Sequence, residues 1–190
     1  MEEEKFYHIF NRGNNRENIF KEEENYYYFL RQYEKYMLKF IDTYTYCLMP
    51  NHFHFLIQIK EAGKTSKVSK TFEVSQRLTP VEKAFRDFFI SYAKSINKKY
   101  QRTGSLFQYK FKRKEINDEK YLKNLVIYIH QNPVKAELCR FPHEWKFSSY
   151  NALISDSATQ LKRKEVIDWF GDKENFIYCH KSAVELEEDF

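Results

Sequence analysis

Met49–Ile59 reads MPNHFHFLIQI, a run of alternating side chains that begins at a proline-asparagine turn. As a β-strand, the run has a period of two, so its two faces carry different side chains. One face holds the aromatic and β-branched residues Phe53, Phe55, Ile57 and Ile59. The other face holds His52, His54, Leu56 and Gln58. The first face is typical of a core, and the second places two imidazoles at the start of the strand, where a ligand can enter.

A His-x-His pair on a strand can bind one cation and leave other coordination positions open for substrate. The pattern is short and common, and taken alone it favours ordinary half-buried histidines slightly over a metal site. The residues that change this balance lie about seventy positions downstream.

The composition indicates one compact domain with an added tail. The chain has 190 residues, 42% of them hydrophobic, with 18 Phe and 15 Tyr, which excludes extensive disorder. Cys47, Cys139 and Cys179 are an odd number with no Cys-x-x-Cys pair, which favours free thiols. The acidic start Met1–Glu4 does not resemble a signal peptide, and no apolar run approaches the roughly 20 residues that cross a bilayer. We therefore expect a cytoplasmic protein without a membrane segment.

Seven elements are predicted along the chain from periodicity and from helix-capping and helix-breaking residues. They are strand Lys5–Arg12, helix Glu22–Phe40, strand Tyr44–Met49, strand Phe53–Lys60, helix Pro80–Tyr100, strand Ser105–Ile116 and helix Glu119–Asn132, which Pro133 ends. The order of the first six elements predicts an α+β, ferredoxin-like βαββαβ fold with an antiparallel sheet. The added helix is expected on the histidine-bearing face. Residues 61–79 are predicted to form a loop. Residues 1–150 form the expected catalytic domain, and 151–190 a C-terminal helical extension and tail.

The charge distribution points to nucleic acid more strongly than the net charge of +5 does. The segment Lys94–Lys114 contains eight basic residues and no acidic one, so the remainder is net acidic. From Phe107 onward, aromatic and basic residues interleave, as single-stranded nucleic acid requires. An amphipathic edge strand explains this interleaving equally well, and helix-dipole compensation explains Lys94, Lys98 and Lys99. The candidate contacts to nucleic acid are Arg12, Asn14, Arg16, Lys94, Lys98, Arg102, Lys110, Lys112, Arg113 and Lys114.

Cleavage of a phosphodiester by a side chain requires a nucleophile and a cation that neutralises charge on the phosphate. Tyr128 and Asn132 are one helical turn apart, so Asn132 can join His52 and His54 as a neutral metal ligand while Tyr128 points at the same ion. A tyrosine hydroxyl, with a reference pKa of about 10, needs a metal, base or water to react. Tyr121 is the rival nucleophile, but it lies roughly 10 Å farther along the helix.

Three motifs together resemble the single-tyrosine HUH transposases, and within them the REP-associated tyrosine transposase branch. They are Cys47–His54 (CLMPNHFH), Gly104–Gln108 (GSLFQ) and Tyr128–Ala136 (YIHQNPVKA), in a match running from about Tyr7 to Tyr150. The resemblance implies a ferredoxin-like domain that binds single-stranded hairpin DNA. It also implies nicking and rejoining that depend on Mg²⁺ or Mn²⁺ and pass through a 5′-phosphotyrosine.

Carried over to this sequence, the resemblance makes Tyr128 the nucleophile and His52, His54 and Asn132 the metal ligands. Gln131 stays open as an alternative third ligand, because some relatives have Gln where this chain has Asn132. Imidazole ligands by themselves would not select Mg²⁺. Monomer and homodimer stay open, as does a non-catalytic single-strand-binding module on the same fold. A zinc hydrolase of small substrates has less support, since no acidic ligand or general base is evident near the histidines.

Overall fold

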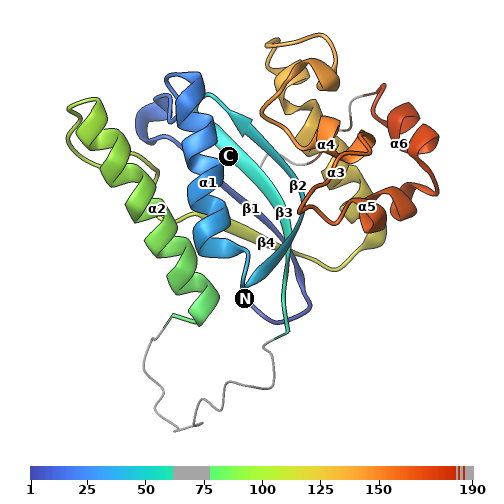
Figure 1. Ribbon diagram of the computed structural model, residues 1–190, viewed down its shortest axis with the longest axis horizontal. Helices are drawn as coiled ribbons and strands as arrows, with labels where there is room; N and C mark the ends of the chain where they lie inside the picture. The colour runs from blue at the N-terminus through green and yellow to red at the C-terminus, as the bar shows by residue number, and fades with distance from the viewer. Residues whose placement is uncertain (62–77, 183, 185, 187–190) are drawn as a thin grey trace, which may run out of the picture.

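Four strands form a single antiparallel sheet in the order β2-β3-β1-β4. The computed structural model in Figure 1 describes residues 1–61, 78–182, 184 and 186. Its first elements are β1 (Phe6–Arg12), α1 (Glu23–Met37), β2 (Ile41–Met49), β3 (His52–Ile59), α2 (Pro80–Lys99), β4 (Lys112–Ile116) and α3 (Glu119–Lys135). This order and pairing confirm the predicted ferredoxin-like βαββαβ plan. The loop predicted over 61–79 lies, in its 62–77 part, outside the described residues.

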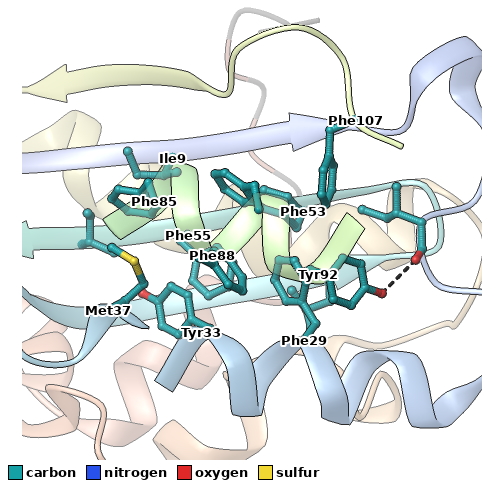
Figure 2. Close-up of a cluster of buried hydrophobic side chains, with 14 of the residues drawn as sticks. Ile9, Phe29, Tyr33, Met37, Phe53, Phe55, Phe85, Phe88, Tyr92 and Phe107 are labelled. Carbon is teal, nitrogen blue, oxygen red and sulfur yellow. Dashed lines mark hydrogen bonds between the residues drawn. The ribbon is translucent and has the colours of Figure 1, made fainter. Parts of the chain in front are cut away.

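One face of the sheet is covered by α1 and α2, which enclose an aromatic core (Figures 1 and 2). Phe53 and Phe55 of β3 point into it, as their alternation predicts, and both are fully buried. Phe29 packs edge-to-face against Phe88 at 4.8 Å between ring centroids. The Tyr92 hydroxyl satisfies its hydrogen bond inside this core by donating to the carbonyl of Ile19 at 2.8 Å (Figure 2). The core fixes β3 in place, so the histidine-bearing face is held rigidly.

The opposite face is covered by α3 and by the helices of the C-terminal extension (Figure 1). These are α4 (Tyr150–Ile154), α5 (Arg163–Phe170) and α6 (Lys173–Cys179). Leu56 of β3 and Leu125 of α3 meet in this second core, which Val166 and Phe176 complete. The predicted packing of the added helix against the histidine-bearing face is therefore confirmed. No helix in the described part of the chain is long and apolar enough to cross a membrane.

The fourth strand begins at Lys112, so the prediction of a strand from Ser105 is wrong for its first seven residues. Residues 105–111 instead cross the end of β1, where Gly13 bridges Phe107 and Gln108 donates its backbone N–H to the Arg12 carbonyl at 2.9 Å. Lys110 has φ of 61°, a left-handed conformation that interrupts strand alternation. The aromatic and basic side chains before Lys112 consequently do not sort onto two strand faces.

Helix α3 continues through Pro133 to Lys135, although proline was expected to end it at Asn132. Pro133 lacks an N–H and costs the helix one backbone hydrogen bond. The last turn still closes, since Ala136 donates its N–H to the Asn132 carbonyl at 2.9 Å, and Pro133 is buried. Two smaller differences are that β2 starts three residues earlier than predicted, at Ile41, and that α1 ends at Met37 rather than Phe40.

Candidate active site

His52 and His54 project from β3 on the face that α3 covers. Their rings lie 5.2 Å apart between centroids and nearly perpendicular. His54 is fully buried, whereas His52, at the first position of the strand, is half-buried. The two imidazoles predicted to share a face are thus side by side, and the outer one is less deeply buried.

A third histidine, His8, joins the pair from the neighbouring strand β1. Its Nε2 lies 2.9 Å from Nδ1 of His54, and the two rings stack at 5.1 Å between centroids. The sequence motifs alone do not identify His8 as part of the site. The signal was the alternation within β1, which puts His8 on the same face as Phe10 and Arg12 once β1 is known to pair with β3.

Tyr128 of α3 stands over these histidines. Its ring lies edge-on to His54 at 5.6 Å and to His8 at 6.5 Å between centroids, and the residue is only 9% exposed. Asn132, one turn later, donates its Nδ2–H to the Tyr128 carbonyl at 2.8 Å and hydrogen-bonds His52. The structure therefore brings together the four residues predicted from the sequence: Tyr128, His52, His54 and Asn132.

The two alternatives considered for these roles lie elsewhere. Gln131 is buried and donates its Nε2–H to the carbonyl of His180, on the side of α3 that faces the C-terminal helices. Tyr121 lies under the ammonium group of Lys114, 4.6 Å from its ring centroid. Of the two neighbouring amides, Asn132 is the one that contacts the histidine pair.

Both histidines of the pair are neutral at pH 7. Burial, together with the nearby Arg12 guanidinium, lowers the pKa of His52 to about 4, against a hydrogen bond with Asn132 that raises it. Burial also holds the pKa of His54 well below its ordinary value, with smaller contributions from the charges of His8, His52 and Arg12. A neutral imidazole has a lone pair that can bind a cation or accept a proton.

The hydrogen bonds around His52 determine which nitrogen carries that lone pair. Asn51 donates its amide N–H to the Arg16 carbonyl at 3.3 Å, which turns its Oδ1 toward His52 Nδ1, 2.6 Å away. Because Oδ1 only accepts, Nδ1 of His52 donates and Nε2 holds the lone pair. At His54, Nδ1 takes part in the hydrogen bond with His8 Nε2, and Nε2 is the ring nitrogen outside that bond.

These donors fit a divalent cation. Within the described residues, no group of three or more His, Cys, Asp and Glu side chains is arranged to hold a metal, so the third protein donor at this pair would be the Asn132 amide oxygen. Two imidazoles and one amide oxygen are neutral ligands, and they suit a transition ion such as Mn²⁺ better than Mg²⁺. The hydrogen bond between His8 and His54 would be the outer contact that orients a ligating imidazole.

Three of the predicted DNA contacts lie on the same face of the sheet. Arg12 stands opposite His52 in the β1–β3 register. Lys114 stands opposite His8, and Lys112 opposite Phe10, with its Nζ 5.7 Å from the Phe10 ring centroid. These side chains surround the histidine pair with positive charge.

The other predicted contacts are distributed over the molecule. Asn14 and Arg16 form a short 3-10 helix (η1) at the end of β1, beside the β2–β3 turn. Lys94 and Lys98 are exposed on α2, across the sheet from the histidines, and Lys110 is exposed before β4. Arg102 is paired with Glu17, and Arg113 with Glu82. Arg12, Lys112 and Lys114 are thus the predicted DNA contacts on the histidine-bearing face, and the others lie elsewhere on the molecule.

Comparison with known proteins points in one direction. No family model matches the chain. A Haemophilus influenzae protein (strain ATCC 51907 / DSM 11121 / KW20 / Rd) named "Putative REP-associated tyrosine transposase" is 27% identical over 110 residues, or 58% of this chain. The match spans 59% of that relative's length.

A solved structure supports the same comparison at the level of fold. It is a REP-associated tyrosine transposase bound to a REP hairpin, and it superposes with a TM-score of 0.59 over 82% of each chain, at 15% identity. In sequence and in fold, the chain is therefore similar to REP-associated tyrosine transposases.

Proposed function

We infer that this protein cleaves and rejoins single-stranded, hairpin-bearing DNA through a covalent bond to Tyr128, as a transposase-type DNA nickase and strand transferase. The observation that carries the proposal is the position of Tyr128 over His54, with Asn132 of the same helix bonded to His52. A tyrosine, two neutral imidazoles and an amide meet in a site bordered by Arg12. The resemblance to REP-associated tyrosine transposases supports this assignment.

In the proposed reaction, the Tyr128 oxygen attacks a phosphorus atom of the DNA backbone. A bond forms between that oxygen and phosphorus, the bond from phosphorus to O3′ breaks, and the 3′ oxygen leaves and takes up a proton. The tyrosine proton passes to water. The resulting 5′-phosphotyrosine retains the energy of the phosphodiester, so attack by a 3′ hydroxyl can rejoin DNA without ATP.

The side chains of the site have distinct roles in this scheme. His52, His54 and Asn132 would hold Mn²⁺ or Mg²⁺, which supplies charge neutralisation at the phosphate and favours the ionised tyrosine. The bond from Asn132 to the Tyr128 carbonyl keeps nucleophile and ligand in a fixed relation. Arg12 borders the site beside His52, as a group that binds the scissile phosphate would.

The test is a denaturing-gel assay with labelled hairpin DNA that carries randomised single-stranded flanks. We expect a covalent protein–DNA band with the wild type in Mn²⁺ or Mg²⁺, none in EDTA, and none with Tyr128→Phe. Tyr121→Phe is the matched control, since it also removes a tyrosine hydroxyl from α3. This variant should keep the band. DNA binding without any metal-dependent band would instead support a non-catalytic single-strand-binding module.

A further inference from the structure

A second surface, on the α2 side of the sheet, has the composition of a nucleic-acid site. A groove of about 730 Å³ lies between α2 and residues 105–113. Its volume is in the range of pockets that enclose small organic ligands. The histidines and Tyr128 are not among the residues that line it, so it is distinct from the candidate active site.

The floor of this groove is aromatic and rigid, and its rim exposes apolar side chains. The Phe89 ring is tilted against that of Phe111 at 5.5 Å and meets Phe107 edge-on at 5.4 Å between centroids. At the rim, Tyr109 is 91% exposed and Ile90 45% exposed. Most of the Tyr109 ring is in contact with water. A flat ligand that stacks on the ring removes this apolar surface from water, which favours binding.

The charges around the groove complement phosphates. Arg86, Lys110 and Arg113 line it, and Glu82 is the acidic residue among the lining side chains of the described chain. Glu82 is paired with Arg113, and Arg86 is paired with its neighbour Asp87. The Lys110 ammonium lies 5.5 Å from the Tyr109 ring centroid, so one cation accompanies the exposed aromatic face. An aromatic platform with adjacent cations is the combination that binds unpaired nucleotides.

The groove also connects with the candidate active site. β4 pairs with β1 only as far as Phe10 and Lys112, so Asn11 and Arg12 extend beyond its end. There, Gln108 donates its backbone N–H to Arg12, and Asn11 lines the groove. Arg12 itself faces His52. Because β4 is the edge strand, DNA can pass around it from the catalytic face, along Lys112 and Lys110, into the groove.

We propose that this groove binds unpaired nucleotides of the DNA strand that flanks the cleaved phosphodiester, with a base stacked on Tyr109 and phosphates held by Arg86, Lys110 and Arg113. The proposal rests on the proposed function, since it assigns the groove to the same DNA substrate. It adds a binding site for the single-stranded flank, separate from the one that holds the reacting phosphate.

The experiment compares two alanine variants of exposed tyrosines. Tyr109→Ala removes the rim platform, and Tyr178→Ala is the matched control. Tyr178 is 70% exposed on α6, and a lysine lies 5.5 Å from its ring, just as at Tyr109. Dissociation constants are measured by fluorescence anisotropy in EDTA for a hairpin with randomised single-stranded flanks and for the same hairpin with flush ends. Tyr109→Trp tests whether a different aromatic platform restores binding.

We expect Tyr109→Ala to weaken binding of the flanked hairpin by roughly five- to a hundredfold, and to leave the flush hairpin unchanged. Tyr178→Ala should match the wild type, and Tyr109→Trp should bind nearly as well as the wild type. Tyr109→Ala should still form the Tyr128 adduct at saturating DNA. Equal binding by all variants, or an equal loss for flanked and flush hairpins, overturns the groove assignment even where the wild type forms its adduct. A wild type that neither binds nor forms an adduct overturns the proposed function itself.

Discussion

His54 lies at the centre of the candidate site, and its orientation is set by His8. The 2.9 Å bond between the two imidazoles is fully buried, where a hydrogen bond is stronger than in water. A histidine that binds a metal normally uses its second nitrogen in such a bond, which fixes the tautomer of the ligating one. His8 is therefore a positioning residue for His54.

Replacing His8 with Phe keeps an aromatic ring in the stack and removes the bond to His54. We expect this variant to need about 10–100 times more Mn²⁺ for half-maximal adduct formation, while DNA binding in EDTA stays at the wild-type level. His143→Phe, at an exposed position outside the site, is the control. A His8→Phe protein with unchanged Mn²⁺ dependence would show that His54 does not rely on His8.

At this scale the sequence predicted the residues that share a motif and missed those that depend on contacts between distant segments. His52 with His54, and Tyr128 with Asn132, are each related by strand or helix periodicity. His8 contacts His54 only because β1 lies next to β3 in a particular register. Helical spacing favoured Asn132 over Gln131, and what Gln131 does instead, a hydrogen bond to His180 of the extension, could not be predicted from spacing.

Helix α3 carries both Tyr128 and Asn132, and buried polar contacts attach it to the sheet. His130 Nε2 lies 2.7 Å from Thr45 Oγ1 of β2 and 2.7 Å from Ser149 Oγ. The Ser149 hydroxyl also accepts the backbone N–H of Tyr46 at 2.9 Å. One hydroxyl thus joins α3 to β2, and removing it leaves buried polar groups with fewer partners.

Ser149→Ala should therefore lower the free energy of unfolding by about 1–3 kcal/mol, as measured by urea titration. Ser148→Ala is a matched neighbour, also buried, but its longer hydrogen bonds of 3.2 and 3.4 Å reach only the local backbone. Ser148→Ala should lower the free energy of unfolding by clearly less than Ser149→Ala does. Equal effects of the two variants would contradict the role assigned to Ser149 in attaching α3.

Element boundaries were predictable where periodicity or capping residues defined them, as at Pro80 of α2 with its Thr79 cap. The fourth strand was predicted too long because Phe107, Tyr109 and Phe111 alternate with polar residues. In the structure, Phe107 and Phe111 pack toward α2 while Tyr109 faces solvent. Tertiary contacts with α2 and β1 therefore override the local pattern.

Buried histidines occur at the contact between α3 and the C-terminal extension as well as in the candidate site. His130 Nδ1 lies 2.9 Å from His180 Nε2, and His180 Nδ1 lies 2.7 Å from the Phe176 carbonyl. Burial lowers the pKa of His180 to about 4, against hydrogen bonds that raise it, and holds the pKa of His130 well below its ordinary value. The C-terminal extension is thus attached to α3 through neutral imidazoles.

These histidines make stability depend on pH. Between pH 6.5 and 4 the unfolded chain binds a proton at His180 that the folded chain does not, so the free energy of unfolding falls as the pH falls. Because of His180 alone, the free energy of unfolding is about 3 kcal/mol lower near pH 4 than above pH 6.5. Urea titrations at pH 7, 6 and 5 should show this decline. Constant stability over that range would contradict buried neutral histidines.

At the scale of the whole chain, the order of strands and helices was sufficient to predict the sheet topology, because few folds accommodate that order. The C-terminal extension was predicted only as a helical extension and tail, without its individual helices. Its three helices have five to eight residues each, too short for a periodic pattern, and they depend on packing against α3.

The most direct test of the central claim is to find which side chain carries the DNA. The covalent complex formed in Mn²⁺ is digested with nuclease and trypsin, and the peptides are analysed by mass spectrometry. Cleavage after lysine places Tyr128 in the peptide Asn124–Lys135 and Tyr121 in Tyr121–Lys123, so the two candidates separate. We predict a 5′-phosphonucleotide on Tyr128. A nucleotide on Tyr121, or on any residue outside Asn124–Lys135, would contradict the site described here.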